Sequence, residues 1–508
     1  MIMKNQIIKI IDENLTKLNL SQFKDKYLVR FNLDNPKFGD YSLNLGLIIK
    51  DKQAVEKIVE VLIKLNFVKK VEVLSGYINI FLKEKVYLDT LNRYSEIKKL
   101  KADLKTIKVE KINCEFVSAN PTGPLSIGNA RGGYQGCAMA NILKIVGHKV
   151  DREYYINDYG NQIKELKKSI IGESDQYQGE YLTEIKQDIK DKNISIIDLS
   201  DYIVKKYIRP SLEKNNLKFD IWFKESTLYP EKVEEAFKLL KTKGLVYTKN
   251  GALWMRTSEL GDEKDRVIIK KNKVNTYFAS DIAYLKDKID RGYERIIFYW
   301  GADHHGYINR IKAVAKAFNY PEKNIVVNLF QLVKVVENNQ PIKVSKRAGK
   351  IITLDQFSDL VSSDVAKYII LSYDPNKEII FDIAKAREKS SKNPVYYAQY
   401  GLVRYKKIRK KIKLQKIIEL KDLGENEKNL ARVIIGFRET IANVSFTYRV
   451  TDLIKYLYYF TKEVHIYYEK EKIVGSENEQ EKLALVNSII NIYETAFKLL
   501  GINNPEKM

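Results

Sequence analysis

The pattern of apolar and polar positions changes twice along the chain and divides it into three parts. In the first part, apolar residues recur at helical spacing in IIKIIDENLTKL and QAVEKIVEVLIKL, and they alternate with polar residues in SGYINIFL. Helical spacing predicts two amphipathic helices, and alternation predicts a half-buried strand. We therefore expect a small α+β domain over residues 1–100.

A different pattern begins near residue 107. KVEKINCEF alternates, with Ile112, Cys114 and Phe116 on one face, and a glycine-rich stretch follows it. ARGGYQGCAMANILKIV then predicts a helix capped by Gly147, and KVDREYYIND predicts a second strand. Strand, loop, helix and strand form a βαβ unit, the start of a parallel nucleotide-binding sheet.

The sheet resumes later in the chain, where RIIFYWGAD predicts a buried strand and INRIKAVAKAF predicts a helix. We expect a Rossmann-type domain over residues 101–388, interrupted by a helical insertion at about 165–255. Polar stretches follow its strands, where open α/β sheets place their ligands. From about Ser390 onward the pattern is almost wholly helical, which predicts a separate helical-bundle domain over residues 389–508.

Composition narrows the class of protein. The formal net charge of the 508 residues is +23, which favours a polyanionic partner such as RNA, although abundant surface lysine alone gives the same value. No uninterrupted apolar run reaches membrane-spanning length, and the start lacks the apolar core of a signal peptide. The 2 cysteines make neither a disulfide framework nor a metal cluster. We expect a soluble cytoplasmic protein without membrane association.

The stretch NPTGPLSIGNARGG, residues 120–133, lies between the first predicted strand and its helix. A loop at a helix N-terminus suits phosphate, because free N–H groups and the helix dipole both favour negative charge. Gly123 and Gly128 would let backbone approach a ligand closely. An ordinary proline–glycine turn has the same composition.

Three further stretches carry candidate chemistry. KVSKRAGK, residues 343–350, suits a mobile clamp on phosphates, and a solvated basic loop has the same composition. TYFASDIAY offers Tyr277 and Asp281. WGADHHGY ends a predicted strand with two histidines whose side chains point apart, which disfavours metal and favours contact with a ribose or base. Hydrogen-bonded surface histidines are the alternative.

Together these stretches resemble the class I aminoacyl-tRNA synthetases, specifically the arginyl-tRNA synthetase family. The resemblance covers essentially the whole chain. CEFVSANPTGPLSIGNARG is similar to the first signature of that family, and KVSKR is similar to the second. Between and around them, in family order, stand REYYINDYGNQI, YQGEY, FDIWFKES, GALWMRTSELGDEKDRV, TYFASDIAY and WGADHHG. NPVYYAQY and LLGINNPEKM resemble the helical anticodon-binding domain.

The resemblance implies activation of L-arginine by ATP with Mg²⁺, in the presence of tRNA(Arg), and transfer of the arginyl group to that tRNA. It implies no protein-held metal, and we expect a monomer. The implied catalytic residues are Ser126, Gly128, Asn129, Lys343, Ser345 and Lys346. The implied ATP-binding residues are Pro124, Gly128, Gly301, Asp303, His304 and Lys346. The implied arginine-binding residues are Glu115, Asn120, Tyr277, Asp281 and His305. Carboxylates agree with this role, because a guanidinium prefers them in fork geometry.

The two outer domains are implied to bind tRNA. In the N-terminal domain, which resembles the part of the family that touches the tRNA elbow, Tyr77 can stack on a base and Asn79 can bind a base edge. A core position for Tyr77 is the alternative. In the C-terminal domain, Arg404 and Lys407 can meet phosphates, although a solvated helix face would look the same.

One departure from the family pattern stands out. The family normally has histidine at the first and fourth positions of the first signature, where this chain has Ser126 and Asn129. Asparagine keeps a neutral N–H donor, whereas serine is much shorter than an imidazole. The sequence leaves open an active enzyme or a non-catalytic or impaired paralogue that binds tRNA or has a regulatory role.

Overall fold

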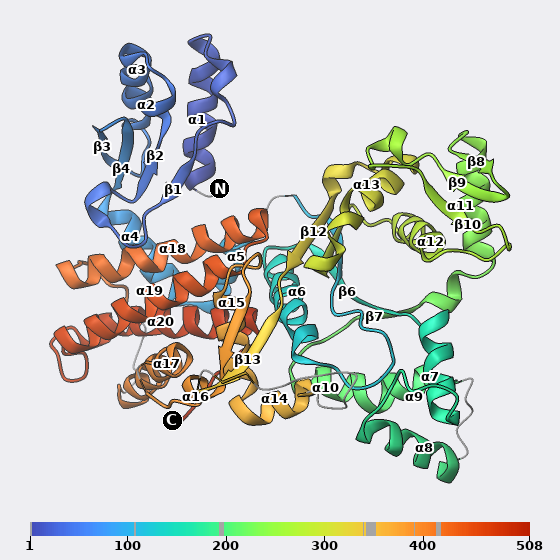
Figure 1. The fold of residues 1–508 in the computed structure, drawn as a ribbon. Coiled ribbons are helices and arrows are strands. Elements are labelled where there is room, and N and C mark those ends of the chain that lie inside the picture. Colours follow the sequence, from blue (N-terminus) through green and yellow to red (C-terminus); the bar gives the residue numbers. More distant parts are fainter. Residues whose placement is uncertain are drawn as a thin grey trace. The chain divides into compact units, whose positions relative to one another are not determined.

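The computed structural model describes residues 3–105, 108–192, 198–338, 340–341, 352–390, 392–412 and 418–508 (Figure 1). The chain forms two compact units. Unit 1 comprises Met1–Lys105, Ser390–Lys498 and Asn503–Met508, and unit 2 comprises Thr106–Lys389 and Leu499–Ile502. The first and last parts of the chain thus cluster together, and the division into three domains with the boundaries given above stays a prediction.

Unit 1 begins with a four-stranded antiparallel sheet of order β1-β2-β4-β3. Two helices, α1 and α3, contribute their apolar faces to the same core as this sheet. The predicted helices and the predicted strand are confirmed. The elements are α1 (Met3–Lys17), β1 (Val29–Phe31), β2 (Tyr41–Leu43), α2 (Leu45–Ile48), α3 (Lys52–Leu62), β3 (Val68–Leu74), β4 (Tyr77–Leu82), α4 (Glu84–Tyr94) and α5 (Ile97–Asp103).

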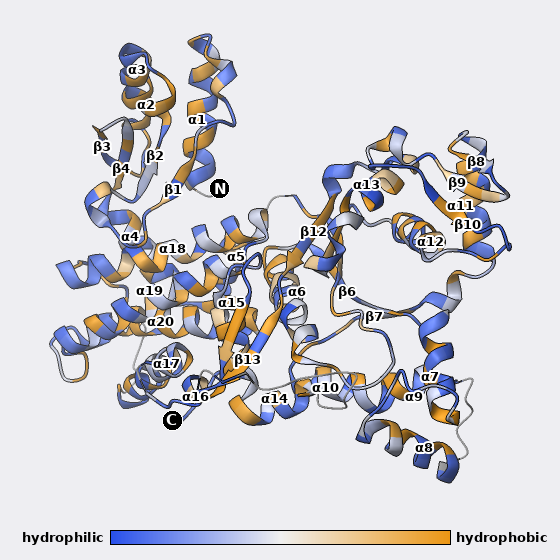
Figure 2. Ribbon diagram, in the orientation of Figure 1, coloured by the Kyte–Doolittle hydropathy of each residue, from blue (hydrophilic) through white to orange (hydrophobic). Residues whose placement is uncertain are grey.

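The rest of unit 1 is the predicted helical bundle. It consists of α17 (Pro394–Lys411), α18 (Glu425–Thr447), α19 (Thr451–Lys470) and α20 (Glu479–Leu500). These helices carry both hydrophobic and hydrophilic residues (Figure 2), as expected where one side packs and another meets water. By length and composition α20 would suffice to cross a membrane, but 89% of its apolar window is buried inside the protein, as in a core helix.

Unit 2 is built on a five-stranded sheet of order β12-β11-β5-β6-β7, and every pair of neighbours is parallel. This confirms the Rossmann-type prediction. The chain runs from β5 outward to β6 and β7, and later returns to the other side of β5 through β11 and β12. The order therefore reverses between β5 and β11, where such sheets bind ligands beyond the strand ends. The strands are β5 (Lys111–Glu115), β6 (Lys149–Ile156), β7 (Ile221–Lys224), β11 (Arg295–Gly301) and β12 (Ile325–Phe330).

Three helices connect or follow these strands, and a smaller three-stranded sheet, β14-β13-β15, follows β12. The helices are α6 (Ile127–Ile145), α12 (Tyr277–Asp290) and α13 (Ile308–Ala317). The later elements are β13 (Val333–Glu337), β14 (Gln340–Pro341), α14 (Leu354–Val361), α15 (Ser363–Ser372), β15 (Ile379–Asp382) and α16 (Ile383–Ala386).

The insertion is not wholly helical, which corrects the prediction for residues 165–255. β7 lies within this range and forms the edge of the parallel sheet, and an antiparallel sheet of order β10-β9-β8 extends to Ile269. Asn250 and Gly251 have φ of 53° and 75° and join β8 to β9, as a tight hairpin turn requires. The insertion contains α7 (Asn161–Ile171), α8 (Glu180–Lys192), α9 (Leu199–Ile203), α10 (Arg209–Lys214), α11 (Glu231–Thr242), β8 (Val246–Lys249), β9 (Ala252–Met255) and β10 (Arg266–Ile269).

Glycines bring α6 close to the sheet. A Cβ at Gly136 would lie 2.4 Å from the Phe116 ring, and one at Gly132 would lie 2.5 Å from the Phe330 ring. Phe116 follows β5 and Phe330 ends β12, so the helix that begins at the signature loop packs directly against strand ends. The helix can lie this close to the sheet only because Gly132 and Gly136 have no side chains.

We predict that Gly136→Ala lowers the stability of unit 2 by up to about 2 kcal/mol, because shifting the fully buried Phe116 costs about 1–3 kcal/mol. A gain of about 1 kcal/mol in helix propensity offsets part of this cost. The thermal unfolding midpoint is the measurement. Gly133→Ala is the control on the same helix, since its Cβ would meet only the ends of Leu217 and Val117 at 3.0 Å. A loss no larger than that of the control would contradict the packing argument.

Candidate functional site

The candidate site lies at the carboxyl ends of β5 and β11. Glu115 is the last residue of β5, and its partner in the register of β11 is Phe298. β11 runs on to Gly301. The first signature follows β5 and the GADHH stretch follows β11, so the parallel sheet brings two of the predicted segments to one edge.

The backbone is strained directly after Glu115. Val117 and Ser118 have φ of 67° and 37°, in a region that a β-branched residue rarely adopts. Each such residue costs about 1–3 kcal/mol and persists only where its surroundings hold it. Here β6 supplies that hold: the Tyr155 N–H donates to Ser118 Oγ at 3.0 Å, and the Tyr154 hydroxyl donates to the Ala119 carbonyl at 2.8 Å.

The signature residues Ser126 and Asn129 bind each other at the start of α6. Asn129 Oδ1 accepts from both the backbone N–H and the hydroxyl of Ser126, each at 3.0 Å. Both hydrogen bonds use the amide oxygen of Asn129. Its amide nitrogen, Nδ2, donates no hydrogen bond to any described residue. Pro124, Ser126, Gly128 and Asn129 are all half-buried.

Three carboxyl groups cluster beside the strand ends. Glu115 comes from β5, Asp281 from α12, and Glu225 from the short turn Glu225–Leu228 after β7. Burial, followed by the charges of Glu225 and Glu115, raises the pKa of Asp281 to about 7, against the opposing effect of Arg310. No described residue gives Asp281 a hydrogen bond or an ion pair. This cluster of three carboxyl groups, called the acidic pocket below, suits a cationic ligand because one of its carboxyls is unpaired.

Glu225 was not among the residues we assigned from the sequence. It is 3% exposed, accepts from Ser280 Oγ at 2.6 Å, and burial raises the pKa of its carboxyl. The stretch FDIWFKES contains Glu225. Nothing in that stretch shows that the end of β7 comes to lie beside α12, which is why sequence patterns missed it.

The other three predicted arginine-binding residues are more exposed than Glu115. Tyr277 begins α12 and is 54% exposed, one turn before Asp281. Asn120 is half-buried in the loop after β5, and His305 is exposed in the turn after β11. The structure thus brings Glu115 and Asp281 together and leaves the contribution of the other three as predictions.

Charged groups fill the space beneath the pocket. Glu153 of β6 is fully buried and contacts Lys288 Nζ at 2.9 Å and Arg291 Nη1 at 2.5 Å. Although burial by itself raises the pKa of Glu153, these two cations hold it below its usual range. Lys288, also fully buried, further contacts Glu115 Oε2 at 3.0 Å.

The turn after β11 carries the predicted nucleotide contacts. Gly301 allows the Asp303 side chain to fold close, because a Cβ would lie 2.4 Å from Asp303 Oδ1. Asp303 and His304 are exposed, 3.6 Å apart between Oδ2 and Nε2, and the His304 ring lies 6.1 Å from that of Trp300. Exposed polar groups at a strand end agree with contacts to a ribose or base.

The second signature, with Lys343, Ser345 and Lys346, lies outside the described residues. The described segment that follows it meets the first signature: the Leu354 N–H donates to the Leu125 carbonyl at 2.8 Å, and Thr353 forms a β-bridge with Ser126. On the other side, the fully buried Arg131 of α6 donates to the carbonyls of Gln331 at 2.7 Å and Leu332 at 3.3 Å. The segments flanking the second signature are thus tied to the first.

Arg131 also donates to the carbonyls of Asp374 at 2.9 Å and Lys377 at 2.7 Å. Burial lowers its pKa to about 10. Sequence reasoning missed this residue, although it is the only arginine in a helix otherwise composed largely of glycine and apolar residues. Among the described residues, no group of three or more His, Cys, Asp or Glu could hold a metal ion.

The two residues predicted to contact RNA in the N-terminal sheet of unit 1 differ in their exposure to solvent. Tyr77 is 44% exposed at the start of β4. Asn79, predicted to bind a base edge, is instead 3% exposed, and its Oδ1 accepts from Ser42 Oγ at 2.7 Å. β4 is an interior strand, so Ser42 of the neighbouring β2 covers Asn79, and a base contact would have to displace it.

Arg404 belongs to a stack of rings in the bundle. Its guanidinium lies 4.6 Å from the Tyr400 ring and 4.0 Å from the Tyr468 ring, and both tyrosines are 39% exposed. Nη1 of Arg404 is 3.3 Å from Nδ1 of the buried His465, whose pKa is lowered first by burial. Lys407 is exposed one turn later on α17. Exposed rings beside a guanidinium suit an unstacked base.

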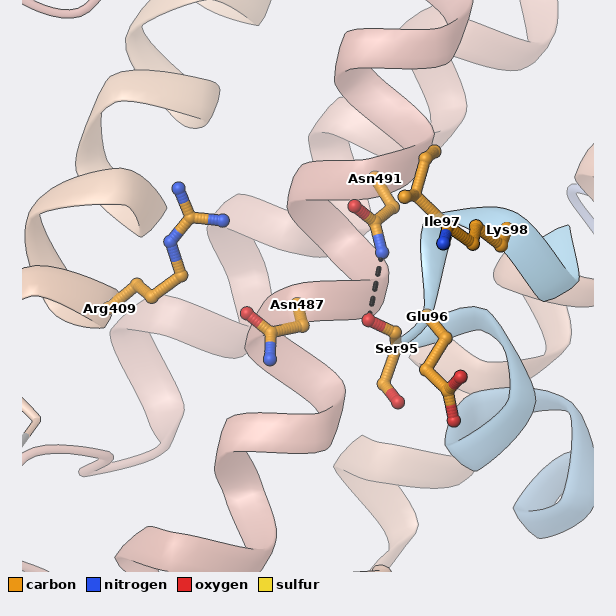
Figure 3. A pocket seen from close by; sticks show the side chains of 7 residues that line it. All are labelled: Ser95, Glu96, Ile97, Lys98, Arg409, Asn487 and Asn491. Carbon is orange, nitrogen blue, oxygen red and sulfur yellow. Dashed lines mark hydrogen bonds between the residues drawn. The ribbon is translucent and has the colours of Figure 1, made fainter. Parts of the chain in front are cut away.

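A pocket of 340 Å³ lies elsewhere in unit 1 (Figure 3). Asn491 lines it and donates to the Ser95 carbonyl at 3.0 Å. Arg409 and Lys98 give it positive charge, and Asn487 offers an amide. Its lining residues are Ser95, Glu96, Ile97, Lys98, Arg409, Asn487 and Asn491.

Known families match all three parts of the chain. The arginyl tRNA synthetase N terminal domain matches residues 5–82, the catalytic domain of tRNA synthetases class I (R) matches 179–413, and the DALR anticodon binding domain matches 398–508. The structure superposes on Thermus thermophilus arginyl-tRNA synthetase with a TM-score of 0.78 over 99% of this chain and 100% of that one, at 19% identity, which is a likeness of fold.

Two relatives extend the likeness to sequence. An arginine--tRNA ligase of Aquifex aeolicus is 33% identical over 98% of this chain and 100% of its own length. One of Bacillus subtilis is 34% identical over 94% of each. With the parallel sheet, the acidic pocket and the helical bundle, these matches establish that the chain belongs to the arginyl-tRNA synthetase family.

Proposed function

We propose that the chain is an arginine–tRNA ligase. An oxygen of the arginine carboxylate attacks the α-phosphorus of ATP, the bond to pyrophosphate breaks, and arginyl-adenylate forms. A hydroxyl of the terminal ribose of tRNA(Arg) then attacks the arginyl carbonyl, and AMP leaves. We expect the first step to require tRNA, and the enzyme to act as a cytoplasmic monomer.

The single observation that carries the proposal is the acidic pocket formed by residues from β5, α12 and the turn after β7. Glu115 and Asp281 approach one space from β5 and α12, and Asp281 has no described partner. A substrate guanidinium would supply the missing charge and could bind carboxylates by paired N–H donors. Glu225 adds a third acidic group, which favours a cation over a neutral side chain of similar shape.

ATP is proposed to lie between the start of α6 and the turn after β11. Asn129 Nδ2 and the first N–H groups of α6 would face phosphate, and Asp303 with His304 would face the nucleoside. Magnesium enters as the complex with ATP, because Mg²⁺ is commonly held by substrate phosphates and one or two carboxylates. Lys343, Ser345 and Lys346 are proposed to bind the triphosphate.

The tRNA is proposed to contact Tyr77 in the N-terminal sheet and the Tyr400–Arg404–Tyr468 stack, with Lys407, in the bundle. Ring faces accept any base, and lysine and arginine neutralise phosphates. The alternative, a non-catalytic paralogue, receives no support from the described residues: the acidic pocket, the strained loop and the flanks of the second signature are all intact.

The test is aminoacylation of homologous tRNA with labelled arginine and MgATP, and pyrophosphate exchange with and without that tRNA. Charging with arginine, and no charging with lysine or ornithine, is the expected result. Tight tRNA binding without charging or exchange would favour the non-catalytic alternative.

We predict that arginine binding strengthens as pH rises to about 7 and is constant above. In the free protein Asp281 is protonated below that pH, whereas a bound guanidinium favours the carboxylate, so binding must release a proton. The arginine Kd should rise by up to about tenfold for each pH unit below 7. Calorimetry in buffers of different ionisation enthalpy measures both Kd and proton release.

The matched variants are Asp281→Asn and Asp290→Asn, the second at the exposed end of the same helix. Asp281→Asn should bind arginine weakly at every pH and release no proton, and Asp290→Asn should behave like the unchanged protein. A pH-independent Kd between pH 6 and 8 in the unchanged protein would refute the pocket assignment.

We predict that Asn129→Asp lowers the rate of pyrophosphate exchange by about 10²–10³-fold. The aspartate keeps an acceptor for Ser126 but removes the Nδ2 donor that would face phosphate. Folding should not suffer, because a carboxylate is favourable at a helix N-terminus. Asn272→Asp is the control, since it adds the same charge in an exposed turn and keeps an acceptor for the Val274 N–H. Near-normal exchange by Asn129→Asp would show that Asn129 makes no such contact.

A further inference from the structure

Lys288 occupies a position that its charge makes unusual. It lies on α12 and its side chain is fully buried. Its ammonium group donates to Asn113 Oδ1 at 2.5 Å and to Glu153 Oε1 at 2.9 Å, and it forms an ion pair with Glu115 Oε2 at 3.0 Å. Two of its three N–H donors thus form hydrogen bonds, and the charge of the group also attracts Glu115. The ion pair holds Oε2 of Glu115 on the side of α12.

Tyr284 acts on the same oxygen of Glu115. Its hydroxyl lies 2.9 Å from Glu115 Oε2 and 2.5 Å from Glu153 Oε1. Since one hydroxyl proton cannot serve both carboxylates at once, the ion pair with Lys288 is the contact that Glu115 Oε2 keeps in either case. Among the described residues, Oε1 of Glu115 receives no hydrogen bond. The two oxygens of one carboxylate therefore differ: Oε2 is held by the protein and Oε1 remains for a ligand.

We propose that Lys288 is a positioning residue for arginine: by holding Oε2 of Glu115, it leaves one oxygen of this carboxylate for the substrate and makes Asp281 the partner that binds the guanidinium through two oxygens. The proposal rests on the proposed function of the pocket. It adds that an internal lysine sets how many charges the pocket presents.

The charge count of the pocket follows from this geometry. Glu115 and Glu153 face Lys288, Glu153 also faces Arg291, and Arg291 Nε lies 2.8 Å from Asp287. Asp287 in turn contacts Lys232 at 2.5 Å. These six charges balance, so they add no net charge beneath the site.

The groups left to respond to a ligand are Asp281 and Glu225, with Arg310 on the side of α13 and Tyr155 on β6. One cation with fork geometry can meet Asp281 fully and Glu115 by one oxygen. The ammonium group of lysine or ornithine also has three donors, but it lacks the planar fork that meets both oxygens of one carboxylate while a further N–H reaches the other carboxylate. Lys288 would therefore contribute to the selection of arginine.

The experiment is arginine binding by calorimetry from pH 6 to 8.5, together with kcat and KM, for the full-length protein and for Lys288→Met. The control is Lys286→Met, two residues away on the same helix, whose ammonium group binds Asp290 at 2.6 Å. Loss of Lys288 should raise the arginine KM by about 10–100-fold, with kcat at saturating arginine within about threefold and the ATP KM unchanged.

The pH dependence separates positioning from support of the fold. Without Lys288, Glu115, Glu153 and Asp281 repel one another, so the pair Glu115–Asp281 should hold a proton to higher pH. The pH below which arginine affinity falls should then move upward by about one unit. Lys286→Met should leave it in place.

Two further variants keep the inference testable if Lys288→Met unfolds. The double variant Glu153→Gln/Lys288→Met removes both buried charges, and its arginine KM should stay raised; a normal KM would overturn the proposal by making Lys288 a mere counterion of Glu153. Tyr284→Phe should raise the arginine KM less than Lys288→Met does.

Unchanged arginine KM and pH profile in the Lys288 variants would overturn the inference while the proposed function stands. Equal losses for arginine and ATP would likewise overturn it, because they would indicate general disruption. Failure of the unchanged protein to bind arginine would overturn the pocket assignment and the inference with it.

Discussion

The contact between Glu153 of β6 and Lys288 and Arg291 at the end of α12 determines where unit 2 places its chemistry. Removing one partner of such a buried pair costs about 3–5 kcal/mol, whereas replacing the whole group by apolar residues is often neutral. The value of the network thus lies in position more than in stability. It fixes the rotation of α12 about its axis, so that Asp281, seven residues before Lys288, faces the same end of the sheet as Glu115.

A second constraint acts on the backbone next to Glu115. Val117 and Ser118 lie in a strained conformation that β6 holds through Ser118 and Ala119. The turn allows the chain to leave β5 and enter α6 with the signature residues beside the strand ends. Arg131, one turn into α6, then binds four carbonyls of the segments before and after the second signature. The loop after β5 is therefore held by β6, and the segments that flank the second signature are held by Arg131 of α6.

Helices and strands in both units could be predicted from the sequence where apolar residues recur at regular spacing, as in α1, β4 and the βαβ unit around α6. β7 escaped prediction because its four residues are all half-buried and carry no clear alternation. Glu115 and Asp281 were assigned to the arginine site through the resemblance and the chemistry of guanidinium. Lys288 and Glu225 were not, because a lysine or glutamate in an amphipathic pattern looks solvent-facing. Only the pairing of β5, β6 and β7 under α12 makes them interior residues. The burial of Asn79 likewise depends on the pairing of β4 with β2, and its contact with a base stays a prediction.

The structure also changes how the first signature should be understood. Sequence alone treats Ser126 and Asn129 as two separate losses of histidine. In the structure they act as one group, because both the backbone N–H and the hydroxyl of Ser126 hold Asn129 Oδ1. A freely rotating amide presents a donor or an acceptor to phosphate, and an acceptor would repel it. By fixing the oxygen, Ser126 turns Asn129 into a donor of defined direction, which is the property that electrostatic catalysis requires. If Asn129 meets phosphate as proposed, the short serine acts by orienting its neighbour and does not have to reach the phosphate itself.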